Sequence, residues 1–115
     1  MTKKINSKQK GKRGELDVAH LFQEHGFAQA RRSQQYAGIN NDADVVGAPF
    51  LHLEVKNVEK LNLYKAIEQS VNDAKECQIP VVFHTRNRKP WYVTLNAEDF
   101  MNMYKAWLKL KGWAG

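Results

Sequence analysis

Apolar residues recur at helical spacing in three segments of the chain. The first runs over 14–25, where Glu15, Val18, Ala19 and Phe22 share one face and Gly26 follows as a C-terminal cap. The second is predicted over 61–76. The third begins after Asn96, a favourable N-cap, and ends at Gly112. The apolar positions of the last two helices are Tyr64, Ile67, Val71 and Ala74, and then Phe100, Met103, Tyr104, Trp107 and Leu108.

Shorter segments have the composition of strands. They are predicted over 27–33, 43–48, 51–56, 79–85 and 91–95, with a loop over 36–41 and a tight turn over 47–50. Residues 79–85 are almost continuously apolar, which is typical of a strand buried on both faces. This order of elements predicts the α/β class, with a central mixed β-sheet flanked by α-helices. A chain of 115 residues is long enough for one such domain.

The positive charge is concentrated at the N-terminus. The net charge is +6, and residues 1–14 contain six basic and no acidic residues, so the rest of the chain is neutral. We therefore expect a flexible basic arm over 1–13 and a single domain over 14–115. A mobile basic arm on a neutral body favours an anionic polymer such as DNA or RNA, although it would also serve as a solubilising tail.

Two further features bear on the setting of the protein. The single cysteine excludes an internal disulfide and a cysteine-based zinc site, and it favours a reducing cytoplasm. No apolar segment approaches the roughly 18 residues of a membrane span, so no membrane partner is expected.

The segment 51–56 carries the candidate chemistry. Alternate residues of a strand face the same way, so His52, Glu54 and Lys56 would share one side. If 43–48 pairs with this strand as a hairpin, Asp44 joins Glu54 and Lys56. Two carboxylates bind a hard divalent cation, and a lysine beside them orients a water or a phosphate. Metal-assisted phosphodiester hydrolysis follows from this arrangement, whereas a cross-strand ion pair on a solvated face is the alternative.

Glu15 is unusual because it lies on the apolar stripe of the first helix. A carboxylate there needs a partner, since burial of an unpaired charge is costly. A bound cation would supply one. Alternatively, Glu15 stays hydrated in the first helical turn, where the helix dipole favours an acid.

With an acidic residue on the first helix, Asp44 before Val45-Val46, and Glu54-Val55-Lys56 in a strand, the chain resembles the PD-(D/E)XK nuclease superfamily. Its small size is similar to that of archaeal and phage Holliday junction resolvases and of virus-type replication–repair nuclease domains. The resemblance covers residues 11–95 and implies a restriction-endonuclease-like core. Ala43 replaces a proline common in this family, and Asp42 is a competing aspartate, but Asp44 directly precedes the apolar pair.

The resemblance implies a role for each matched residue. Asp44, Glu54 and the Val55 carbonyl would bind Mg²⁺ or Mn²⁺, and Glu15 would complete the metal shell directly or through water. Lys56 would position the attacking water or help to deprotonate it. Gln69 falls where related nucleases often have an active-site glutamine, although a solvated glutamine is an equal interpretation. The products would carry a 5′-phosphate and a 3′-hydroxyl.

Basic residues outside this group are candidates for DNA contacts. They occur before the first helix, in the segment 27–33 and in the turn over 86–89. For the turn, the alternative is an exposed hairpin with no ligand. They are Lys8, Lys10, Lys12, Arg13, Arg31, Arg32, Arg86, Arg88 and Lys89, with Tyr36 as a further backbone contact.

The leading hypothesis is a Mg²⁺-dependent DNA endonuclease that acts on Holliday junctions or other branched DNA in recombination or replication, in a host cytoplasm if the gene is a phage gene. Resolvases of this kind are homodimers, so a homodimer is expected; Trp107 and Trp113 would lie in the core or on a dimer surface. The alternatives are a nicking, restriction-like or repair nuclease of the same fold, or a non-catalytic nucleic-acid-binding module.

Overall fold

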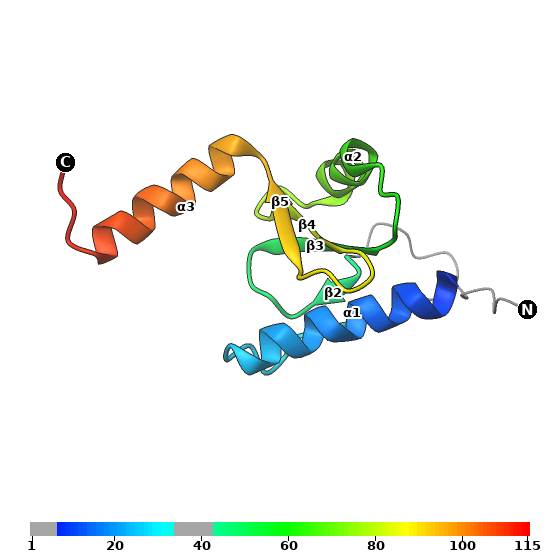
Figure 1. Ribbon diagram of the computed structural model, residues 1–115. Helices are drawn as coiled ribbons and strands as arrows, with labels where there is room; N and C mark the ends of the chain where they lie inside the picture. Colours follow the sequence, from blue (N-terminus) through cyan, green and yellow to red (C-terminus); the bar gives the residue numbers. More distant parts are fainter. Residues whose placement is uncertain (1–6, 34–42) are drawn as a thin grey trace, which may run out of the picture.

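The computed structural model describes residues 7–33 and 43–115. Its elements, in chain order, are α1 (Ser7–Glu24), β1 (Arg31–Arg32), β2 (Val45–Val46), β3 (Leu51–Asn57), α2 (Leu63–Asp73), β4 (Ile79–Thr85), β5 (Tyr92–Leu95) and α3 (Ala97–Leu110) (Figure 1). The sheet has the order β1-β2-β3-β4-β5, with β3 and β4 parallel and the other pairs antiparallel. The predicted mixed sheet of an α/β fold is therefore confirmed.

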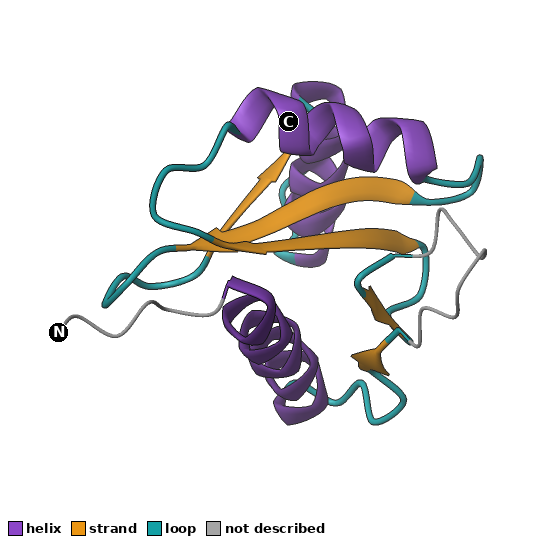
Figure 2. Cartoon of the chain, turned by 90° about the vertical axis from the view of Figure 1, so that its right-hand side faces the viewer, coloured by secondary structure: helices purple, strands orange, loops and turns teal. Residues whose placement is uncertain are grey.

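The sheet lies between α1 on one face and α2 on the other (Figure 2). The main apolar core forms on the α1 side, where Val18 and Ala19 pack against Leu53, Val55 and Phe83 of the two central strands. These strand residues alternate with the ones that face α2, as the pleat requires. The apolar and the polar sides of β3 are thus separated by the sheet itself.

Two predicted strands are shorter than expected. Only Arg31–Arg32 of the segment 27–33 and only Val45–Val46 of the segment 43–48 are strands. The second ends early because Gly47 turns the chain with φ 92° against the backbone of Gln29, where a Cβ atom would lie 2.2 Å from the carbonyl oxygen. The hairpin between β2 and β3 is nevertheless formed. Asp42, Tyr36 and the rest of the predicted loop lie outside the described residues.

The first helix begins seven residues earlier than predicted. It starts at Ser7 rather than Gly14, so residues 7–13, which were predicted to belong to a flexible arm, are helical. Lysine, glutamine and arginine favour helices, and they outweigh Gly11 and Gly14 in this segment. The early turns are also held in place, because Asn57 Nδ2 donates a hydrogen bond to the Lys10 carbonyl oxygen at 3.1 Å. Residues 1–6 lie outside the described chain.

Only half of the apolar side predicted for α2 faces the sheet. Ile67 and Ala74 are half-buried, but Tyr64 and Val71 are 85% and 53% exposed, and Ala66 and Ser70 are buried in their place. Beneath α2, β3 presents His52, Glu54 and Lys56, and β4 presents the buried Val82. The inner side of α2 is accordingly rotated towards its small residues.

The last helix begins at its predicted cap, where the Asn96 side chain accepts a hydrogen bond from the Glu98 backbone N–H at 2.8 Å. None of its residues is buried, and it projects away from the sheet (Figure 1). Trp107 and Trp113 are therefore not core residues of this chain. The helices within the described residues are all too short or too polar to cross a membrane.

The contact between α1 and the end of β3 gives a test of the packing. A Cβ atom at Gly14 would lie 2.9 Å from Asn57 Cβ and 3.3 Å from Trp91 Cη2, whereas at Gly11 it would meet nothing within 4 Å. We expect Gly14→Ala to lower the free energy of unfolding by about 1–3 kcal/mol, as overpacked sites do. Gly11→Ala is the matched control and should raise it by about 0.5–1 kcal/mol. Urea unfolding measures both; equal effects would contradict the close packing.

Candidate active site

The hairpin of β2 and β3 sets Asp44 across from Glu54. The pairing of Val45 with Leu53 puts these two acids at the next position of the antiparallel ladder. The Asp44 backbone N–H donates to the Leu53 carbonyl at 2.9 Å, and Asp44 Oδ2 accepts from the Val55 N–H at 2.8 Å. Asp44 is thus fixed at both its backbone and its side chain.

Negative charge accumulates at this point of the sheet. Burial raises the pKa of Asp44 to about 7, and repulsion from Glu54 and then Glu15 adds to this effect, while the Val55 N–H opposes it. The raised pKa means that the ionised form of Asp44 lacks enough positive charge around it. Carboxylate oxygens are the ligands that hard divalent cations prefer, so the donor set fits such an ion.

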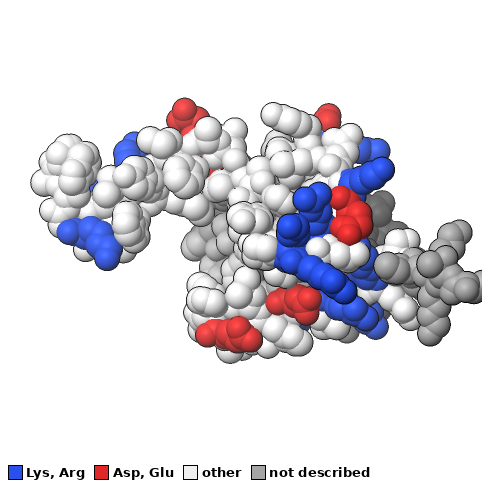
Figure 3. Space-filling view, viewed as in Figure 1, with Lys and Arg blue, Asp and Glu red and all other residues white. Residues whose placement is uncertain are grey.

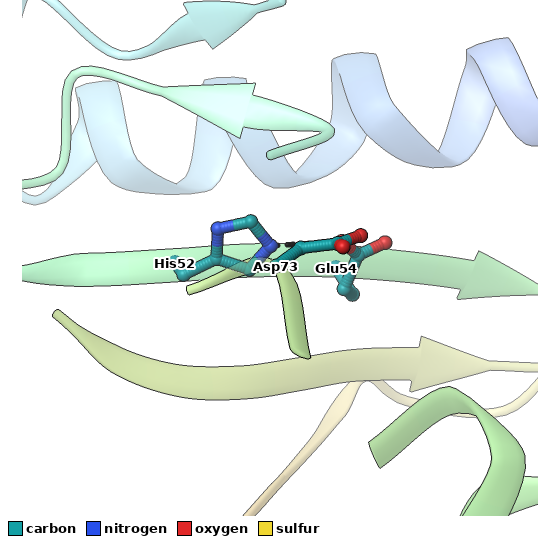
Figure 4. Close-up of side chains that lie close together, drawn as sticks. All are labelled: His52, Glu54 and Asp73. Carbon is teal, nitrogen blue, oxygen red and sulfur yellow. Dashed lines mark hydrogen bonds and ion pairs between the residues drawn. The ribbon is translucent and has the colours of Figure 1, made fainter. Parts of the chain in front are cut away.

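Glu54 is also held from the other side. Its side chain is almost completely buried, and its Oε1 lies 2.9 Å from Nε2 of the equally buried His52. Asp73 of α2 joins them, since one ligand atom from each of the three residues lies within 4.8 Å of the others (Figure 4). A histidine bound to a metal-binding carboxylate fixes its orientation, as second-shell groups commonly do.

Sequence reasoning missed Asp73, and it placed His52 on the strand face of Glu54 without giving it a role in the site. The signal for Asp73 is its spacing, because it follows Gln69 by four residues and so lies on the same side of α2. This signal was hidden by the wrong choice of the inner helix face.

Lys56 lies on the same strand face as Glu54 and contacts α2. Its Nζ donates to Gln69 Oε1 at 3.4 Å, a long hydrogen bond between two partly hydrated side chains. The two residues line an open groove of about 230 Å³ together with Lys65. The structure therefore places Gln69 beside the lysine, which sequence reasoning left undecided.

Glu15 has a protein partner in this structure. It lies in the interior of α1, so its predicted place in a first helical turn is wrong. Its Oε1 accepts from Nε of Arg32 at 3.0 Å, and this ion pair supplies the charge compensation that its position requires. Arg32 is thus engaged by an acid of the site, while Arg31 is exposed and its Nη1 donates to the Gln29 carbonyl.

Basic side chains gather on one part of the surface, over the first turns of α1 and around the turn between β4 and β5 (Figure 3). The turn is closed by a hydrogen bond from the Lys89 N–H to the Arg86 carbonyl at 3.1 Å, with Arg88 at φ 61°. An open groove of about 670 Å³ adjoins it. The exposed basic residues of this surface are Lys8, Lys12, Arg13, Arg86, Arg88 and Lys89; Lys10 is half-buried.

This basic surface reaches the candidate site. Asn57, which binds the Lys10 carbonyl, is the residue after Lys56 at the end of β3. Lys56 itself faces α2, whereas α1 covers the other face of the sheet, so this hydrogen bond joins the first turns of α1 to the end of β3. Glu15 follows Lys12 and Arg13 on α1, so the basic turns lead into an acid of the candidate site.

A comparison with known protein families matches residues 6–112, nearly the whole chain, to a family described as "Phage putative PDDEXK endonuclease". No curated protein and no solved structure gave a significant match. The matched segment includes every residue of the candidate site.

The raised pKa of Asp44 predicts how stability depends on pH when no metal is bound. The folded protein holds this proton up to about pH 7, while the unfolded chain releases it near 3.8, so stability falls as pH rises between these values. Asp44→Asn removes the effect and should be more stable than the unchanged protein at pH 8, by roughly 1–4 kcal/mol. The two should converge near pH 4.

Thermal unfolding in EDTA from pH 4 to pH 8 measures this difference. Mg²⁺ added at pH 8 should stabilise the unchanged protein more than Asp44→Asn, because ion binding relieves the repulsion between the carboxylates. Parallel pH profiles for the two proteins would contradict the electrostatic account of the site.

Proposed function

Since the chain belongs to the family of phage putative PDDEXK endonucleases and has a restriction-endonuclease-like α/β fold, we propose that it is a metal-dependent DNA endonuclease with its active site at Asp44, Glu54 and Lys56. The observation that carries the proposal is the burial of Asp44 beside Glu54 and Glu15, which raises the pKa of Asp44 to about 7. Lys56 shares the strand face of Glu54, and the basic turns of α1 precede Glu15 on the same helix. A site built only to bind DNA would gain nothing from acids that repel phosphate.

Asp44, Glu54 and the Val55 carbonyl are the residues that would hold Mg²⁺ or Mn²⁺. Such an ion lowers the pKa of its bound water and stabilises charge at a phosphorus atom. Glu15 acts through water or by holding Arg32, since its Oε1 is bound to that guanidinium. His52 orients the Glu54 carboxylate through their hydrogen bond.

Lys56 is the residue that meets the scissile phosphate and the attacking water. Its ammonium group offsets the charge that develops on the phosphate oxygens, and it orients the water for attack. Gln69 accepts a hydrogen bond from Nζ and so limits the positions of the lysine. No protein nucleophile is needed, and hydrolysis leaves a 5′-phosphate and a 3′-hydroxyl.

The DNA backbone is proposed to lie along the basic surface. Lys8, Lys12 and Arg13 of α1 would contact phosphates on one side of the site, and Arg86, Arg88 and Lys89 on another. Such contacts set the position of the duplex and carry no sequence information. Lys10, Arg31 and Arg32 are weaker candidates, because Lys10 is half-buried and Arg32 is paired with Glu15.

For the substrate we propose branched DNA, such as a Holliday junction, met during recombination or replication in the cytoplasm of a host cell. The proposal is supported by the small size of the chain and by its resemblance to resolvases, which also implies a homodimer. A nicking, restriction-like or repair nuclease of the same fold is the alternative.

Substitutions at the site test the reaction. Asp44→Ala, Glu54→Gln and Lys56→Ala should each lower Mg²⁺-dependent cleavage by at least about 10²-fold, as loss of one group that stabilises the transition state does. DNA binding in Ca²⁺ should be retained. Lys75→Ala, on an exposed turn after α2, is the matched control. Cleavage is measured on a four-way junction, a flap, a linear duplex and a single strand.

An unchanged rate in Glu54→Gln would contradict the assignment of the site. Tight binding without cleavage of any substrate in Mg²⁺ or Mn²⁺ would support a binding module instead. Equal cleavage of the junction and the linear duplex would contradict selectivity for branched DNA but not the nuclease.

The basic surface is tested by the salt dependence of binding. Lys12→Gln with Arg13→Gln should lower the slope of log K against log [salt] by about one unit per lost phosphate contact. Point substitutions are preferable to deletion of 1–13, because residues 7–13 belong to α1. Lys105→Gln on α3 is the control and should leave the slope unchanged; equal slopes in all three proteins would exclude phosphate contacts by α1.

A further inference from the structure

The helix α3 has no partner within the described residues. It is 14 residues long, none of its residues is buried, and no other helix or strand of residues 7–33 and 43–115 packs along it (Figure 1). Isolated helices of this length are marginal in water, because most helix stability in proteins comes from packing of an apolar face. The uncovered apolar face of this capped helix is therefore a candidate for a contact outside the chain as described.

The exposed face of α3 is strongly apolar and ordered. Phe100, Tyr104 and Trp107 recur at the spacing of one helix face, and their rings stack in sequence with centroids 6.1 and 6.3 Å apart. Met103 and Leu110 lie on the same face and are exposed as well. Single exposed apolar residues are ordinary, but a continuous patch of this kind marks an interaction site.

We propose that α3 pairs with α3 of a second copy of this chain, in an antiparallel arrangement about a two-fold axis. Such an interface is self-complementary, so one patch serves both copies. In the antiparallel register Phe100 lies across from Leu110 of the second copy, and Met103 across from its Trp107. The aromatic face of each helix is then covered by the other.

The charges at the two ends of α3 favour antiparallel pairing with a second copy of the helix. The first turn of α3 carries Glu98 and Asp99, and its C-terminal end carries Lys109 and Lys111. Asp99 borders the apolar face, and Lys111 continues it with Nζ 5.4 Å from the centre of the Trp107 ring. Antiparallel pairing brings Asp99 of each copy to Lys111 of the other, whereas parallel pairing would bring like charges together.

The available surface is adequate for a specific dimer of modest affinity. Phe100, Tyr104 and Trp107 are each about half exposed. An aromatic side chain buries about 150–250 Å², so these three offer on the order of 300 Å² per copy and about 600 Å² for two. Met103 and Leu110 raise this area towards the ~1,200 Å² at which specific interfaces begin. The projection of α3 from the sheet leaves this face open to a second copy.

The pairing gives the proposed homodimer a specific geometry. The two catalytic domains would lie at opposite ends of the helix pair, related by its two-fold axis, and each would present its own site to one strand of a symmetric substrate. The proposed pairing follows from the exposed residues of α3 and does not depend on nuclease activity. Failure of cleavage and failure of dimerisation are therefore separate results.

Analytical ultracentrifugation of the full chain in EDTA, from about 1 to 100 µM, tests the pairing. We expect a monomer–dimer equilibrium within this range. Trp107→Glu should weaken it by at least about thirtyfold, as substitutions at the centre of an interface do. Asn102→Glu puts the same charge on the opposite side of the exposed helix and should leave it unchanged. A purely monomeric chain at 100 µM, or equal weakening by both variants, would overturn the proposal.

Charge reversal separates pairing from a general effect on the helix. Asp99→Lys alone and Lys111→Asp alone should each weaken self-association, because like charges then meet at both ends of the pair. A mixture of the two variants should associate more tightly than either alone, by about tenfold for two restored ion pairs. Weakening without recovery in the mixture would exclude the antiparallel register.

An amphipathic helix with tryptophans and lysines also has the composition of a membrane-surface helix. Binding of the chain to vesicles of phosphatidylglycerol and phosphatidylcholine, lost in Trp107→Glu while the chain stays monomeric, would replace the second copy with a lipid surface and overturn the proposal.

Discussion

The burial of Asp44 beside Glu54 is the constraint on which the candidate site of this protein depends. The β2–β3 hairpin holds the two carboxylates side by side, and Glu15, itself paired with Arg32, adds to the repulsion. Burial of these carboxylates without a compensating cation lowers the stability of the folded protein when they are ionised. Unfavourable electrostatics of this kind are typical of functional sites, where a preformed arrangement of charged groups lowers the stability of the fold.

The surrounding structure accommodates this cost by dividing the two faces of the sheet. The face towards α1 is apolar and supplies the main core, while the face towards α2 carries His52, Glu54 and Lys56. The inner side of α2 buries the small residues Ala66 and Ser70, with the half-buried Asp73 beside them. The apolar core and the candidate site thus lie on opposite faces of β3. A substitution on one face therefore makes no direct contact with the side chains on the other.

Several predictions from the sequence failed where local patterns competed with tertiary contacts. The start of α1 was placed at Gly14 because the apolar periodicity begins there, yet the helix extends back to Ser7, and Gly14 packs closely on Asn57 and Trp91. The inner face of α2 was assigned from its apolar residues, although β3 beneath it presents polar ones. The partner of Glu15 was sought in a cation or a helix dipole, whereas Arg32 arrives from a different element. None of these contacts has a signature within one local window.

The α/β class, the central strands and the placement of Asp44 opposite Glu54, with Lys56 on the same face of β3, could be predicted from the sequence alone, because alternation within a strand and the order of the elements are local properties. The family match over residues 6–112 agrees with the predicted nuclease superfamily. Only the tertiary structure decided that His52 and Asp73 meet Glu54, that Gln69 contacts Lys56, and that α3 packs on nothing in the described chain. These are long-range contacts, and the pairing of residues far apart in sequence depends on how all the elements pack together.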